Sequence, residues 1–193
     1  MISRLYARTV FLPTLGWNFF LARILSVRRW WDRIDDHVIV GAFPFARDVA
    51  GLRAEGVRAV VNTCEEYSGP KSQYDRHGIE QLHIPTTDFT HPGLGDVEAA
   101  VEFIQKYKLQ NDSVYIHCKA GRARSATIAM CWLIKYRGMS IDEAQLHLLD
   151  SRSHVNPRLA RRPVVQQFHE ALEAARSEAG YFPAKSEPVT AAS

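Results

Sequence analysis

The chain has 193 residues, of which 46% are hydrophobic and 23% charged, and its formal net charge is +3. This length suits one domain with a sizeable core, and so small an excess of positive charge argues against a nucleic-acid partner. The three widely spaced cysteines do not make a disulfide framework. No paired Cys/His spacing suggests zinc, so we expect neither a metal nor another cofactor.

Residues 1–31 contain five arginines and no acidic residue. Between them, the run at 9–22 is uncharged and aromatic, but it is too short to span a bilayer and is interrupted by Pro13 and Gly16. No small-residue cleavage site clearly follows, which argues against a secretory signal. We expect this segment to lie on an anionic membrane surface or to direct mitochondrial import. The alternative is a helix packed on the domain with its aromatic side chains buried.

The rest of the chain alternates between strand and helix patterns. Short β-branched runs predict strands, and longer runs with apolar residues at helical spacing predict helices. Strands are expected at 38–41, 58–62, 81–84 and 113–118, and helices at 48–54, 95–107, 125–136, 140–149 and 163–176. The alternation predicts an α/β domain at 32–176 with a central, mostly parallel sheet flanked by helices. Residues 177–193 lack a pattern and are expected to form a loose tail.

One loop carries the strongest chemical signal, the run His-Cys-Lys-Ala-Gly-Arg-Ala-Arg-Ser at 117–125. It connects the end of a buried strand to the start of a buried helix, where successive N–H groups and the helix dipole favour an anion. Gly121 would let the backbone approach that anion without a Cβ in the way. We therefore expect a phosphate site formed by Lys119, Ala120, Gly121, Arg122, Ala123 and Arg124.

Three side chains of this loop predict nucleophilic catalysis. A thiol at a helix N-terminus beside an arginine ionises more readily than a free thiol, so Cys118 is the candidate nucleophile. The planar fork of Arg124 matches two phosphate oxygens, and Ser125 can hydrogen-bond the sulfur. The implied reaction is attack on phosphorus, a phosphocysteine intermediate and hydrolysis by water. The alternative is a buried structural thiol beside solvated arginines.

The order His-Cys, five residues, Arg-Ser resembles the signature of cysteine-dependent protein tyrosine and dual-specificity phosphatases. The full run, from His117 to Thr127, resembles mitochondrial-type phosphatases that dephosphorylate phosphatidylglycerophosphate on the route to cardiolipin. The resemblance covers about residues 8–176 and departs from the family at Ala123, where serine is expected. It implies a dual-specificity-phosphatase-like fold. It also implies a membrane-associated enzyme, at the mitochondrial inner membrane in a eukaryote or the cytoplasmic face of the inner membrane in a bacterium. The other matching segments are 11–15, 31–35, 40–44, 65–67 and 152–153.

The resemblance places the general acid at Asp88. The leaving alkoxide needs a proton from a carboxylic acid on a mobile loop, and Asp88 follows the strand expected at 81–84. It would protonate the substrate oxygen and then activate water against the phosphocysteine. One alternative is a turn or N-cap role for Asp88. Another is Asp96 as the acid, although Asp96 fits better in the first turn of the following helix.

Other polar residues near the loop have two interpretations each. One phosphate does not need Lys119 and Arg122, so they suggest a substrate with further negative charge; the alternative is solvent exposure. His117 is expected to be a satisfied core histidine that shapes the loop rather than a general base. Arg152 and Arg158 are expected at the surface, with an approach to the site as the alternative.

The residues after the strand expected at 58–62 could support the site. By resemblance, Glu65, Glu66 and Tyr67 would orient the loop or hydrogen-bond its arginine; the alternative is a solvated loop end. Cys64 lies where this strand and the nucleophile's strand should end side by side. We hypothesise that it traps the oxidised nucleophile as a reversible disulfide, as a resembling cysteine does in the phosphatase-and-tensin lipid phosphatase. The alternative is an idle thiol. The mechanism itself needs a reduced nucleophile and so a reducing compartment.

Three functions are compatible with these residues. The first is hydrolysis of phosphatidylglycerophosphate, and the second is a dual-specificity phosphatase that acts on phosphotyrosine, phosphoserine or phosphothreonine in proteins. A deep pocket would favour phosphotyrosine, whereas a shallow basic site would admit a lipid headgroup. The third is a phosphate-binding module without catalysis, which does not need the intact set Cys118, Arg124, Ser125 and Asp88.

Overall fold

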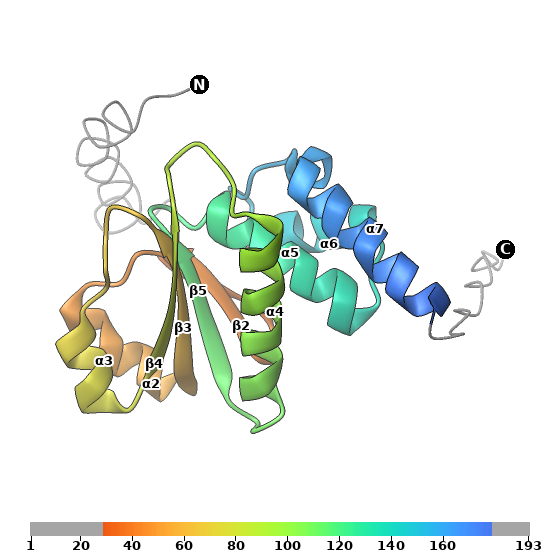
Figure 1. Ribbon diagram of the computed structural model, residues 1–193. Coiled ribbons are helices and arrows are strands. Elements are labelled where there is room, and N and C mark those ends of the chain that lie inside the picture. The colour runs from red at the N-terminus through yellow and green to blue at the C-terminus, as the bar shows by residue number, and fades with distance from the viewer. Residues whose placement is uncertain (1–28, 179–193) are drawn as a thin grey trace, which may run out of the picture.

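A computed structural model describes residues 29–178. A five-stranded sheet in the order β1-β2-β5-β3-β4 forms its centre (Figure 1). Only the edge strand β1 runs antiparallel to its neighbour, and the other pairs are parallel. This architecture confirms the predicted α/β domain with a mostly parallel sheet. The strands are β1 (Trp31–Asp35), β2 (Val38–Ala42), β3 (Val57–Cys64), β4 (Glu80–Thr86) and β5 (Ser113–Cys118).

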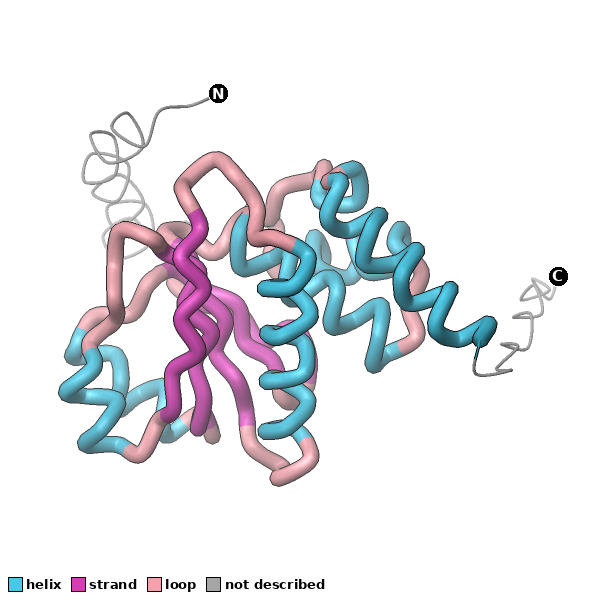
Figure 2. Tube along the Cα trace, in the orientation of Figure 1, coloured by secondary structure: helices cyan, strands magenta, loops and turns pink. Residues whose placement is uncertain are grey.

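Helices cover both faces of the sheet (Figures 1 and 2). One face carries α2 (Val49–Ala54) and α3 (Lys71–His77), and the other carries α4 (Leu94–Lys108) and α5 (Arg124–Arg137). The helices α6 (Ile141–Ser151) and α7 (Pro163–Glu178) pack against α5 from outside. Two short 3₁₀ turns complete the elements, η2 (Ala46–Asp48) and η3 (Leu159–Arg161).

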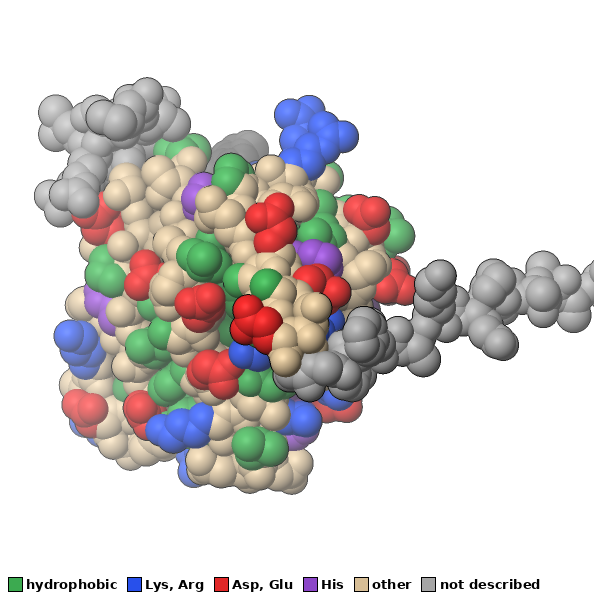
Figure 3. Space-filling model, turned by 45° about the vertical axis from the view of Figure 1, so that its right-hand side comes forward, with side chains coloured by type: hydrophobic (Ala, Val, Ile, Leu, Met, Phe, Trp, Pro, Cys, Tyr) green, Lys and Arg blue, Asp and Glu red, His purple; other side chains and the backbone are tan. Residues whose placement is uncertain are grey.

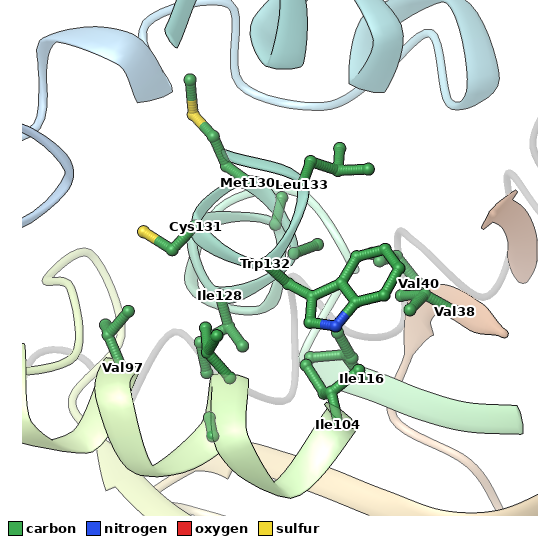
Figure 4. Packing of buried hydrophobic residues seen from close by; sticks show 14 of the residues in the cluster. Val38, Val40, Val97, Ile104, Ile116, Ile128, Met130, Cys131, Trp132 and Leu133 are labelled. Atoms are coloured by element: carbon green, nitrogen blue, oxygen red, sulfur yellow. The ribbon is translucent and has the colours of Figure 1, made fainter. Parts of the chain in front are cut away.

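The core forms two clusters because successive strand residues point to opposite faces of the sheet. In β5, Val114 and Ile116 pack with α4 and α5, whereas Tyr115 packs with the smaller cluster under α2 and α3. All residues of β2 and β5 are buried, as expected for central parallel strands. Figure 4 shows Trp132 of α5 beside the β2 and β5 side chains Val38, Val40 and Ile116. This contact fixes α5, and with it the loop before α5, over the sheet.

The expected elements are confirmed with small shifts at their ends. The strand predicted at 113–118 matches β5, and the Ser140–Glu143 capping box opens α6. The structure adds β1 and α3, which the patterns did not predict. Each buries few side chains: β1 is half polar, and α3 buries only Tyr74.

The ends of the described domain lie slightly outside the expected bounds. Trp30 is buried beside Phe43 and Phe45, and Trp31 opens β1, so both residues of the segment assigned to 1–31 take part in the fold. At the other end, α7 continues to Glu178. The membrane role expected for the amino-terminal segment and the loose tail at 177–193 fall mostly outside the described residues.

The carboxyl ends of the four parallel strands meet at one edge of the sheet. Ala42 pairs with Cys118 and Cys64 with Thr86, so the loops after β3, β4 and β5 converge there, at the top of Figure 2.

Among residues 29–178 no helix has the length and apolar character that crossing a membrane requires. On the face seen in Figure 3, acidic and basic side chains are intermixed.

Candidate active site

The loop at 119–123 joins β5 to α5, as the sequence predicts. Its sharp bend depends on Gly121, which has a left-handed φ of 66°. A Cβ there would also lie 2.5 Å from the carbonyl carbon of Gly41 in β2. Glycine is therefore required for packing of the loop on the neighbouring strand, a reason that spacing alone does not reveal.

Cys118 ends β5 as a buried thiol, 4% exposed. The Ser125 hydroxyl donates a hydrogen bond to its sulfur over 3.3 Å. Burial alone would raise the pKa of the thiol. The charge of Arg124 and hydrogen bonds from Ser125 and the Ala120 backbone outweigh burial and lower the pKa from 9.0 to about 7. A large share of the thiol is therefore thiolate at neutral pH, as a nucleophile requires.

Arg124 opens α5 with its side chain 2% exposed. Its Nη1 donates to the carbonyl of Thr86 over 2.7 Å and to the carboxylate of Glu66 over 3.0 Å. Its Nη2 lies 3.0 Å from Oδ1 of Asp88, but the N–H groups are not aligned for a hydrogen bond, so this buried nitrogen lacks an acceptor among the described residues. A phosphate oxygen would supply one.

Asp88 reaches the loop from the segment after β4. Its carboxylate pairs with Arg124 and with the ammonium of Lys119. It lies in a tight turn, where Thr90 donates to the carbonyl of Thr87. The structure therefore places the predicted acid beside the predicted nucleophile loop. Asp96 instead lies exposed in the first turn of α4, where its charge suits the helix dipole.

The two extra cations of the loop have different environments. Lys119 is buried and pairs with Asp88. Arg122 is exposed, and its Nε donates to the carbonyl of His154 over 2.8 Å. Of the two, only Lys119 therefore lies beside the candidate acid.

The segment after β3 supports the site through its side chains. Glu66 is buried against Arg124, which fits the predicted role rather than a solvated loop end. Glu65 accepts a hydrogen bond of 2.7 Å from Thr87 in the turn that carries the candidate acid. The Tyr67 hydroxyl donates to the carbonyl of Pro44 over 2.7 Å.

Arg152 was expected at the surface, and that expectation is wrong. It is buried beneath the loop, where its Nε donates to the carbonyl of Gly121 over 2.9 Å and its Nη1 pairs with Asp32 of β1. The sequence pattern does not reveal this buried position, because the partner Asp32 is distant in sequence. Arg158 is exposed, as expected.

Two further buried groups flank the nucleophile. Burial lowers the pKa of His117 to about 3, so its ring is neutral, which suits a shaping role better than that of a base. The expectation that this histidine is satisfied is wrong, because neither ring nitrogen has a well-aligned hydrogen-bond partner among the described residues. Burial also raises the pKa of the Cys64 thiol well above its ordinary value, while the nearby Arg124 lowers it in part. Cys64 and Cys118 interact electrostatically, yet both are free thiols. The disulfide between them stays a prediction.

Arg162, just before α7, was not identified from the sequence. Its Nη1 donates to Oγ1 of Thr127 in α5 over 3.0 Å, which brings it next to the loop. No motif marks it, because only the packing of α7 on α5 brings it near.

In residues 29–178 no cluster of His, Cys, Asp and Glu is arranged to hold a metal ion.

Comparison with known proteins agrees with this geometry. Residues 38–170 match the family "Dual specificity phosphatase, catalytic domain". The chain is 39% identical over 164 residues to phosphatidylglycerophosphate phosphatase PTPMT2 of Arabidopsis thaliana, covering 83% of this chain and 72% of the relative. It is 35% identical over 185 residues to phosphatidylglycerophosphatase and protein-tyrosine phosphatase 1 of Homo sapiens, covering 91% and 92%.

Solved structures give the same result. The crystal structure of PTPMT1 matches with a TM-score of 0.70 and 34% identity, covering 77% of this chain and 99% of that one. The structure of PTPMT1 in complex with PI(5)P matches with a TM-score of 0.69 and 32% identity, covering 76% and 98%. The chain therefore belongs to the dual-specificity phosphatase family and is a cysteine-dependent phosphatase.

Proposed function

We propose that the enzyme hydrolyses the phosphomonoester of phosphatidylglycerophosphate to give phosphatidylglycerol. This reaction is a step on the route to cardiolipin. The observation that carries the chemistry is the Cys118 thiol, held with a lowered pKa beside Arg124 and Ser125. The choice of substrate rests on the similarity, over most of the chain, to phosphatases named for this lipid.

In the first step, the Cys118 thiolate attacks phosphorus and the bond to the leaving oxygen breaks. Asp88 gives its proton to that oxygen, so the glycerol hydroxyl leaves uncharged. Arg124 and the backbone N–H groups of the loop bind the equatorial oxygens, where charge is held in the transition state. Asp88 must therefore be displaced from Arg124 and carry a proton when substrate is bound.

In the second step, water attacks the phosphocysteine while Asp88 takes one of its protons. The S–P bond breaks, inorganic phosphate leaves, and the sulfur returns as thiolate. Ser125 hydrogen-bonds the sulfur and so stabilises it as a leaving group. The lowered pKa of Cys118 favours this departure for the same reason that it favours the initial attack.

A phospholipid headgroup as ligand is supported by the relative that was crystallised with PI(5)P. A lipid substrate requires contact with a membrane, and the basic residues at 4, 8, 23 and 28 would attract anionic lipid. We place the enzyme on the mitochondrial inner membrane in a eukaryote, or on the cytoplasmic face of the inner membrane in a bacterium.

Protein phosphatase activity is the second candidate. The human relative carries protein-tyrosine phosphatase in its name as well, and the same site chemistry serves both substrates. The two are separated by comparing kcat/KM of the purified chain for short-chain phosphatidylglycerophosphate and for phosphopeptides. We expect a clear preference for the lipid. A preference for phosphopeptides, with no lipid turnover, would overturn the proposed substrate and leave the phosphatase chemistry intact.

A further inference from the structure

Arg162 places a positive charge near the phosphate loop, and the reaction described above does not use this charge. Its Nη1 donates to Oγ1 of Thr127 over 3.0 Å and to the carbonyl of Thr90 over 3.4 Å. Thr127 lies in the first turn of α5, shortly after Arg124, and Thr90 follows Asp88 in the next loop. The guanidinium therefore lies between the first turn of α5 and the loop that carries the candidate acid.

The charges of the site interact with this guanidinium. Burial lowers the pKa of Arg162, the Cys118 thiolate raises it, and the neighbouring Arg124 lowers it. These interactions place Arg162 within the electrostatic field of Cys118 and Arg124.

Arg162 differs from Arg124 and Arg152 because it faces no acid. Arg124 pairs with Glu66 and Arg152 pairs with Asp32, but among residues 29–178 no carboxylate pairs with Arg162. Its Nε and Nη2 likewise have no hydrogen-bond partner in that part of the chain. A partly buried charge that contacts only neutral oxygens is costly, and its free donors suit an anion.

The remaining cations are already assigned. Arg124 and the loop N–H groups take the phosphomonoester, the Lys119 ammonium lies against the carboxyl group of the candidate acid Asp88, and Arg122 bonds to a backbone carbonyl. We propose that Arg162 binds a second anionic group of the substrate, a phosphodiester a few bonds from the phosphomonoester, and so selects substrates that carry both. This rests on the proposed function, because phosphatidylglycerophosphate has such a diester on its glycerol headgroup.

Three substrates isolate this contact. The first is dihexanoyl phosphatidylglycerophosphate, and the second is its analogue with the diester methylated to an uncharged triester. The third is p-nitrophenyl phosphate, which has no second group. The full chain is compared with Arg162→Gln, with Arg162→Lys, and with Arg161→Gln as a matched control at an exposed neighbour.

We expect Arg162→Gln to lower kcat/KM for the charged diester by about 10- to 100-fold, the size of one charge-assisted hydrogen bond, mainly through KM. Its effect on the triester and on the aryl phosphate should stay within about twofold, since the contact is missing there in the unchanged enzyme. Arg162→Lys should recover part of the loss, and Arg161→Gln should lose nothing.

Two results would overturn the proposal. Equal losses on all three substrates would mean that Arg162 only positions the Asp88 loop, and unchanged kinetics on the diester would mean that no contact forms. Failure of the unchanged enzyme to hydrolyse the diester at all would instead remove the proposed function, and this inference with it.

Discussion

Cys118 shows how a fully buried thiol becomes reactive. Burial opposes ionisation, but one guanidinium and three hydrogen bonds favour the thiolate strongly enough to reverse the net direction. The buried Cys64 and Cys131, by contrast, have raised pKa values. Reactivity toward alkylating agents near neutral pH should therefore be confined to Cys118.

The Ser125→Ala variant tests this balance. The thiolate fraction grows as pH rises through the pKa of Cys118, so the rate of alkylation by iodoacetamide should rise with a midpoint near 7. Loss of the Ser125 hydroxyl removes a hydrogen bond that favours the thiolate, so the midpoint should move to higher pH. Mass spectrometry of the Cys118 peptide measures the rate. The exposed Ser153→Ala is the control, and an unshifted midpoint in Ser125→Ala would contradict the assignment.

Asp88→Asn tests the general acid. A glycerol leaving group needs a proton, whereas p-nitrophenolate leaves readily without one. We therefore expect kcat for short-chain phosphatidylglycerophosphate to fall by about 100-fold or more, and kcat for p-nitrophenyl phosphate to fall much less. Asp96→Asn, at an exposed carboxylate, should leave both unchanged. Equal slowing of both substrates would argue against Asp88 as the acid.

At the scale of elements, the phosphate loop is held from three directions. Gly41 of β2 contacts Gly121, the helix α5 continues directly from the loop, and Arg152 after α6 donates to the carbonyls of Gly121 and Ala120. Arg152 in turn pairs with Asp32, so the edge strand β1 contributes to the loop's geometry although it lies two strands away from β5.

The Asp32→Asn variant should be both less stable and less able to bind phosphate. It leaves the buried charge of Arg152 without a carboxylate, a change that costs about 3–5 kcal/mol. Urea denaturation followed by tryptophan fluorescence measures the stability, and competitive inhibition by vanadate reports on the loop. The control is Asp36→Asn, whose side chain is 91% exposed. A loss of stability no larger than in the control would refute a structural role for this pair.

Local patterns predicted the elements that bury the most apolar surface. The strand β5 and the helix α5 are recognisable because most of their side chains are apolar. The loop between them is recognisable because the spacing of Cys118, Arg124 and Ser125 suits nucleophilic attack on a phosphate. Asp88 could be placed only by resemblance. Arg152 and Arg162 could not be placed, because their partners Asp32 and Thr127 come from distant segments that only tertiary packing brings together.

At the scale of the whole molecule, the proposed lipid substrate requires the enzyme to bind a membrane surface. The amino-terminal arginines offer a test that spares the catalytic site. Replacing Arg4, Arg8, Arg23 and Arg28 by glutamine should weaken binding to anionic vesicles, by about 1 kcal/mol for each arginine near the surface. Hydrolysis of p-nitrophenyl phosphate should stay unchanged. Vesicle co-sedimentation measures the binding, and undiminished sedimentation would exclude the segment as the anchor.

The ion pairs of Asp88 with Arg124 and Lys119 also bear on the end of each turnover. Once inorganic phosphate has formed, it competes with the carboxylate for the same two cations. Return of Asp88 to them speeds product departure, so orthophosphate should be a weak inhibitor of the unchanged enzyme. It should inhibit Asp88→Asn at lower concentration, because the neutral amide cannot take its place.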